Sequence, residues 1–92
     1  MKKQQPIYGQ SNSWSHYSEN GVVVQIGYSH LKLTRTPLIF TSLHAASHIW
    51  TTTGATSIYG ATKDGFSVYV SGLNKDQMFE HKAVLHYQLI PQ

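Results

Sequence analysis

Residues 65–71 alternate between apolar and polar side chains, and this pattern constrains the fold more than any other feature of the chain. Phe66, Val68 and Val70 would lie on one face of an extended segment, with Ser67, Tyr69 and Ser71 on the other. A period of two is typical of a strand with one buried face. The segment therefore predicts a half-buried strand that begins after a turn at residues 63–65.

Further strand-like runs, separated by turn residues, occupy most of the chain. They comprise residues 21–26, 37–43, 47–53, 56–62 and 82–90. Only residues 76–82 are compatible with a helical turn. Short strands at this spacing, with no helices alternating between them, predict an all-β fold, a six- to seven-stranded antiparallel β-sandwich.

The chain of 92 residues has room for one hydrophobic core. We expect residues 1–13 to form a polar N-terminal arm and residues 14–92 to form a single β-sandwich domain. A domain of this size buries only somewhat over ~60% of the surface of its unfolded chain. The sequence has no cysteine for a stabilising disulfide. Self-association is therefore expected, because it buries more apolar surface and protects sheet edges.

Charged residues make up 12% of the chain, about half of the usual share. The net charge of +3 arises from seven Lys and Arg residues that are scattered along the sequence. Nucleic-acid binding needs several cations on one face, so we expect no nucleic-acid partner. No apolar run is long enough for a membrane span or a signal peptide. We therefore expect a soluble chain with no membrane insertion, cytoplasmic unless it is a fragment of a longer protein or is exported by another route.

The sequence contains no pattern typical of an enzyme active site. Its four acidic residues, Glu19, Asp64, Asp76 and Glu80, lie in or beside predicted turns, where solvated charge is the ordinary role. It has no cysteine nucleophile, no Gly-x-Ser-x-Gly elbow and no glycine-rich phosphate loop. We therefore expect no catalytic residues and no enzymatic activity.

Two of the six histidines, His44 and His48, are four residues apart. On a helix they could share a metal ion, but in an extended chain they would stand ~13 Å apart. No third ligand lies beside them in the sequence. We therefore expect neither a metal site nor a cofactor.

Three stretches carry a family resemblance. Trp14-x-x-Tyr17-Ser18-x-x-Gly21 leads into a valine-rich run, Thr-Pro-Leu-Ile-Phe-Thr-Ser-Leu (residues 36–43) continues towards His48-x-Trp50, and Thr62-x-x-Gly65-Phe66-x-Val68-Tyr69-Val70 follows. Residues 14–90 thereby resemble the H-type lectin-like domains, the group named after snail agglutinin and also found in discoidins. The resemblance implies a six-stranded antiparallel sandwich that forms trimers and binds N-acetylgalactosamine or a related sugar near subunit contacts.

The chain also departs from that family. Thr53 stands where the sugar-binding members carry an arginine, and the loop of residues 72–76 replaces their Trp-His pair. No sugar-binding residue therefore transfers position by position.

The candidate ligand site combines aromatic and polar residues near predicted turns. We expect Trp50 to stack on the apolar face of a sugar while His48, Asn74 and Asp76 bind its hydroxyl groups, with Tyr59 contributing from the adjoining strand. Alternatively, Trp50 is an anchor in the core or in a subunit interface.

Two functions remain open. The first is a carbohydrate-binding module, for N-acetylgalactosamine or galactose, that self-associates as a homotrimer or, in a larger form, a hexamer. The second is a purely structural assembly domain with no small-molecule ligand. Both predict an oligomer, and only the first predicts a glycan.

Overall fold

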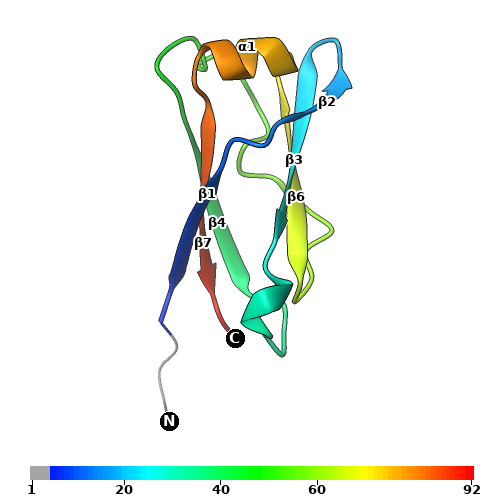
Figure 1. The fold of residues 1–92 in the computed structure, drawn as a ribbon, viewed down its shortest axis with the longest axis vertical. Helices are drawn as coiled ribbons and strands as arrows, with labels where there is room; N and C mark the ends of the chain where they lie inside the picture. Colours follow the sequence, from blue (N-terminus) through cyan, green and yellow to red (C-terminus); the bar gives the residue numbers. More distant parts are fainter. Residues whose placement is uncertain (1–4) are drawn as a thin grey trace.

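The fold consists of two antiparallel sheets that face each other as two layers (Figure 1). The computed structural model describes residues 5–92. The three-stranded sheet has the order β1–β7–β4, with β1 at Ile7–Ser11, β7 at Val84–Ile90 and β4 at Leu38–His44. The four-stranded sheet has the order β2–β3–β6–β5, with β2 at Ser15–Ser18, β3 at Gly21–Gly27, β6 at Gly65–Ser71 and β5 at Ile58–Tyr59. The prediction of a six- to seven-stranded antiparallel sandwich is confirmed.

Two short helices lie at opposite ends of the sandwich (Figure 1). The 3-10 helix η1 spans Ser29–Leu31, and α1 spans Lys75–Glu80, where a helical turn was expected. Asn74 begins α1 with a reciprocal cap: its side-chain oxygen accepts from the Gln77 backbone N–H, and the Gln77 side chain accepts from the Asn74 N–H, each at 2.9 Å. Met78 points from α1 into the core and is fully buried.

The N-terminal segment is more regular than its composition indicates. Ile7–Ser11 forms β1, which pairs with β7 along its whole length. Part of the expected polar arm is therefore a regular strand of the sandwich. Gly9 explains the close packing there, because a Cβ at this position would collide with the ring of Tyr87. Backbone pairing to β7, together with the packing of Ile7 against the core, places this segment in the sheet.

Two of the predicted strands are largely absent from residues 5–92. Residues 47–53 form a turn, in which Thr52 N–H donates to the Ile49 carbonyl at 3.0 Å and His48 adopts a φ of 66°. Only Thr53 reaches the sheet, through an isolated bridge to Ser71. The predicted strand at residues 56–62 shrinks to the two residues of β5. The threonine-rich sequence has strand propensity, but the chain turns here between the end of β4 and the bridge at Thr53.

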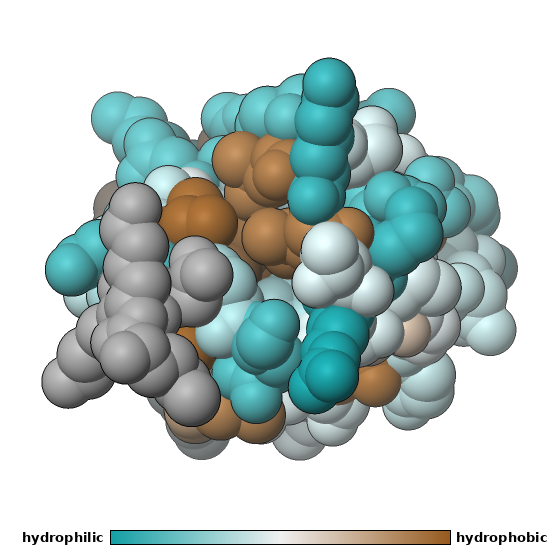
Figure 2. Space-filling view, turned by 90° about the horizontal axis from the view of Figure 1, so that it is seen from below, coloured by the Kyte–Doolittle hydropathy of each residue, from teal (hydrophilic) through white to brown (hydrophobic). Residues whose placement is uncertain are grey.

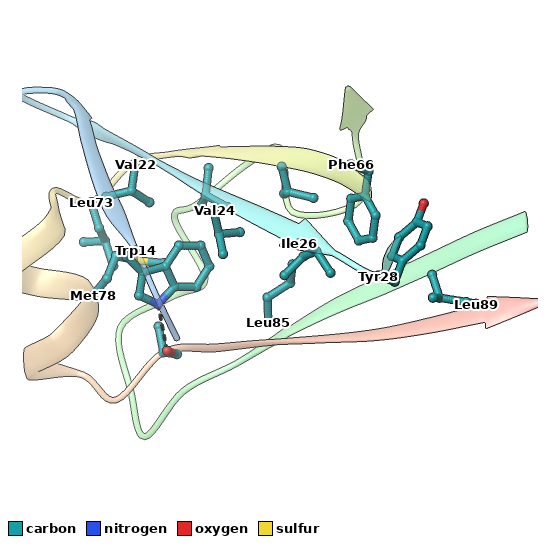
Figure 3. Close-up of a cluster of buried hydrophobic side chains, with 13 residues drawn as sticks. Trp14, Val22, Val24, Ile26, Tyr28, Phe66, Leu73, Met78, Leu85 and Leu89 are labelled. Carbon is teal, nitrogen blue, oxygen red and sulfur yellow. Dashed lines mark hydrogen bonds between the residues drawn. The ribbon is translucent and has the colours of Figure 1, made fainter. Parts of the chain in front are cut away.

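The core lies between the inner faces of the sheets (Figure 3). The alternation in β6 predicts the buried face correctly, since Phe66, Val68 and Val70 are all buried. From the same sheet, β3 contributes its apolar side chains, and β7 faces them with Leu85 and Leu89. The remaining residues of this buried hydrophobic core, which belong to loops, α1 and β3, are Trp14, Val22, Val24, Ile26, Tyr28, Leu73, Met78 and Ala83.

Trp14 connects the two layers. It lies between β1 of one sheet and β2 of the other, and only 2% of its surface is exposed. Its indole Nε1–H donates to the Ala83 carbonyl at 2.8 Å, just before β7 begins (Figure 3). A buried indole needs a hydrogen-bond partner, and this one joins the crossover between sheets to the central strand of the three-stranded sheet.

Tyr28 fixes the opposite end of the core. Its side chain is buried against Phe66, and its hydroxyl donates to the Thr62 carbonyl at 2.8 Å. Burial raises the pKa of the Tyr28 phenol, and the negative charge of Asp64 raises it further.

The raised pKa of Tyr28 predicts an alkaline dependence of stability. The folded chain holds the phenolic proton of Tyr28 more tightly than the unfolded chain does. The stabilisation of the fold by the neutral phenol is therefore complete below about pH 10 and is lost as the pH rises beyond it. Tyr28→Phe should cost about 1 kcal/mol at pH 8 through the lost hydrogen bond. Urea unfolding should show that the stability gap between wild type and Tyr28→Phe narrows above pH 10. A gap that stays constant or widens would contradict this role.

Candidate functional site

Three tyrosines form a row on the outer face of the four-stranded sheet. The ring centroid of Tyr69, in β6, lies 5.0 Å from that of Tyr17 in β2 and 5.2 Å from that of Tyr59 in β5. Both pairs are edge-to-face, with interplanar angles of 74° and 89°. Tyr17 and Tyr59, at the ends of this tyrosine row, are 64% and 54% exposed. The row therefore presents aromatic surface to the solvent across the sheet.

The tyrosine row follows from strand register. Tyr69 belongs to the outward set of β6, and its cross-strand partner in β3 is Val23. Tyr59 pairs with Ser67, which is also an outward residue of β6. The register between β2 and β3 shifts between His16 and Ser18, and Tyr17 lies at this irregularity. Edge-to-face packing of the three rings adds roughly 0.5–1.5 kcal/mol per pair beyond the burial of area.

Hydroxyl groups surround the tyrosine row. Thr53 Oγ1 and Ser71 Oγ hydrogen-bond to each other at 2.8 Å, and Ser67 lies beside Tyr59 in the register. Within residues 5–92, none of the seven strands contains Asp, Glu, Lys or Arg. The face therefore offers aromatic rings and neutral hydrogen-bonding groups, which suit a neutral polyhydroxylated ligand better than a charged one.

Of the predicted site residues, His48 and Trp50 lie in the turn after β4. The His48 ring stacks on that of His81, with centroids 4.6 Å apart, and its Nδ1 is 2.7 Å from Ser47 Oγ. Trp50 is 86% exposed, the highest value among the large hydrophobic residues of the described chain. The alternative of a buried core anchor is therefore wrong, and a ligand or subunit contact remains for Trp50.

Asn74 and Asp76 lie at the start of α1. They line an open hollow of about 360 Å³ together with His16, Glu19 and Lys75. The oxygen of the Asn74 side chain is already bound to the helix N-terminus, so only its amide N–H groups are free for a ligand. The rest of this lining is charged or ionisable.

The structure thus distributes the five predicted residues over three places. Asn74 and Asp76 share the hollow at the start of α1, whereas His48 and Trp50 do not line it. Tyr59 belongs to the tyrosine row. Sequence analysis missed Tyr17 and Tyr69 as partners of Tyr59. The alternation of residues 65–71 places Tyr69 on the face opposite the buried one, but only the strand order shows which side chains of other strands lie beside it.

The outer face of the three-stranded sheet carries exposed hydrophobic side chains among polar ones, and its strands contain no charged residue. Tyr8, Leu38 and Phe40 are all more than half exposed on this face. A hollow of about 230 Å³ lies between the side chains of β1, β4 and β7, with Tyr8, Phe40, His86 and others in its lining. Gln88 donates from its side-chain amide to the Tyr8 hydroxyl at 3.3 Å across this surface.

The end of the sandwich opposite α1 shows a third kind of surface. Hydrophobic residues gather near its centre among hydrophilic ones (Figure 2). At η1 and the C-terminus, a hollow of about 220 Å³ is lined by Leu31, Lys32, Leu33, Thr34, Pro91 and Gln92.

Residues 5–92 hold no group of three or more His, Asp or Glu side chains placed to bind one metal ion. Their single ion pair is Lys63 with Asp64, at 3.2 Å on the surface. No helix in this part of the chain has the length and apolar character to cross a membrane.

Comparison of the chain with protein-family models, with curated proteins and with solved structures gives no match. The chain is therefore described by its architecture, a β-sandwich, without a family assignment.

The two tryptophans offer a matched test of the site. Trp14→Ala should reduce the free energy of unfolding by about 3–5 kcal/mol, because it opens a cavity and leaves the Ala83 carbonyl unpaired. Trp50→Ala removes an exposed ring and should change it by less than about 0.5 kcal/mol. Chemical denaturation of both variants measures the difference. A large loss for Trp50→Ala at micromolar concentration would instead show that Trp50 holds an assembly together.

Proposed function

We propose that this protein is a carbohydrate-binding module of the H-type lectin-like kind that self-associates and binds sugar on the tyrosine row. The single observation that carries the proposal is the exposed row of Tyr17, Tyr69 and Tyr59 on a face without charge. The motif resemblance of residues 14–90 to the H-type lectin-like domains supports the same function.

A sugar ring matches this surface in two ways. Its C–H groups form an apolar face that packs on an aromatic ring, and its hydroxyl groups exchange hydrogen bonds with side chains such as those of Thr53 and Ser71. The two centroid steps of 5.0 and 5.2 Å extend the row beyond one ring, so it fits more than a monosaccharide. Trp50 offers a further exposed ring at the end of the sandwich near α1.

The proposal predicts glycan binding that depends on the ends of the tyrosine row. A glycan array with multivalent display should show bound glycans, with N-acetylgalactosamine and galactose as the first candidates. Tyr17→Ser and Tyr59→Ser should each weaken binding about tenfold, since each removes one stacking ring. Phe79→Ser is the matched control, because it removes an exposed aromatic ring from α1, outside the faces of both sheets. Equal effects of all three variants, or no binding at millimolar monosaccharide, would remove the lectin proposal and leave the fold.

The second candidate is a structural assembly domain, and the exposed hydrophobic side chains on the outer face of the three-stranded sheet favour it. Strands of five, seven and seven residues at ~3.4 Å per residue and ~4.8 Å spacing give this face roughly 310 Å². A standard interface buries about 800 Å² on each partner. A pair of chains joined by this face alone would be weak. A closed ring, in which each chain contacts two others, buries more surface per chain, and the trimer that the family resemblance implies is such a ring.

Self-association through this face predicts a selective effect of charge. Phe40→Lys should shift the sedimentation coefficient towards that of a monomer, because it places an ammonium group inside an apolar contact. Tyr17→Lys, on the other sheet, should leave the assembly intact. The melting temperature of the wild type should also rise with protein concentration. A wild-type chain that sediments as a monomer throughout the micromolar range would contradict this assembly.

A further inference from the structure

Two histidines from neighbouring strands meet on the outer face of the three-stranded sheet. The ring of His44, at the end of β4, lies 4.3 Å from the ring of His86 in β7, with an interplanar angle of 47°. They are diagonal neighbours, because His86 pairs with Ser42 and His44 with Val84. We propose that His44 and His86 form a binding site for a borderline divalent metal ion such as Zn²⁺, Cu²⁺ or Ni²⁺.

The ring nitrogens of this pair are free to act as ligands. In the described chain, neither ring makes a hydrogen bond to a protein atom, and His44 is exposed to solvent. The other histidine pair, His48 and His81, differs in both respects. Its rings are closer to parallel, at 26°, and the Nδ1 atoms of both lie near Ser47 Oγ, at 2.7 and 3.4 Å. Lone pairs of nearly parallel rings point in similar directions, whereas the wider tilt between His44 and His86 is compatible with convergence on one ion.

The donor set selects the class of metal. Zn²⁺ binds imidazole nitrogen at about 2.0–2.1 Å, and neutral imidazole suits Zn²⁺, Cu²⁺ and Ni²⁺. Ca²⁺ and Mg²⁺ prefer oxygen ligands, chiefly carboxylates. The four acidic residues of the chain all lie outside the three-stranded sheet. The pair is therefore expected to discriminate strongly against Ca²⁺ and Mg²⁺.

The surroundings tolerate a cation and offer it further polar groups. Gln10 and Ser42 are the cross-strand partners of His86 and lie on the same face of the sheet. No strand of this sheet carries Lys or Arg; Lys82 lies in the turn before β7. Water fills the remaining coordination positions. The site belongs to one chain and lies on the sheet opposite the tyrosine row, so it does not depend on sugar binding; it shares its sheet face with the proposed assembly contact around Phe40.

The test is a titration of the untagged chain with ZnCl₂, followed by calorimetry and by NMR of the six imidazoles, with MgCl₂ as the ionic control. Zn²⁺ should shift the ring resonances of His44 and His86 in preference to those of the other four. His44→Ala and His86→Ala should each lower the Zn²⁺ association constant by at least about tenfold, since each leaves a single imidazole ligand. The double variant His48→Ala/His81→Ala is the matched control and should retain wild-type affinity.

Each outcome decides for or against the site. Thermal melts check that the surface variants remain folded, and the imidazole spectra of the wild type need no variant. Preferential shifts of His44 and His86 with the stated losses support the proposal. It is overturned by no Zn²⁺ binding up to millimolar concentration, by shifts spread evenly over six histidines, by dependence on His48 and His81, or by equal effects of Mg²⁺.

Discussion

The hydrogen bond from the buried indole of Trp14 to the Ala83 carbonyl is the contact on which the two-layer arrangement depends. Trp14 is the residue at which the chain leaves the three-stranded sheet for the four-stranded one. Ala83 precedes β7, the central strand that pairs with both β1 and β4. One side chain thus fixes the distance between the layers and the start of the strand that organises one of them. With no disulfide in the chain, this packing has to hold the layers together without covalent help.

The second constraint is the neutrality of all seven strands in the described chain. A sandwich needs one apolar face per sheet, and the other face is free to carry charge for solubility. Here both outer faces carry aromatic, hydroxyl, amide and imidazole groups instead, and the charges lie in turns, in α1 and near the ends. The two faces nevertheless differ. One carries the tyrosine row, and the other carries aliphatic and aromatic residues with a histidine pair.

The sequence predicts the parts of the fold that local patterns determine. The alternation of β6, the valine-rich run of β3 and the segment that begins with the proline before β4 each identify a strand, and the helical turn expected at residues 76–82 overlaps α1. The misses arise where tertiary structure decides. Residues 7–11 become a strand because β7 provides partners for their backbone, and residues 47–53 turn despite their strand propensity.

The candidate site was harder to predict, for a reason of geometry. Tyr17 and Tyr59 are 42 positions apart, as are His44 and His86, so only the strand order and register show which outward side chains meet.

The absence of charged residues from the strands limits how tightly the outer faces of the two sheets can bind a ligand. Without charge they gain little from electrostatic steering, and each neutral hydrogen bond adds only about 1 kcal/mol net. Useful affinity then requires repetition of a weak site. Under the proposed function, association through the three-stranded sheet leaves the tyrosine row of every chain facing outwards, so that assembly supplies the affinity that one neutral face lacks.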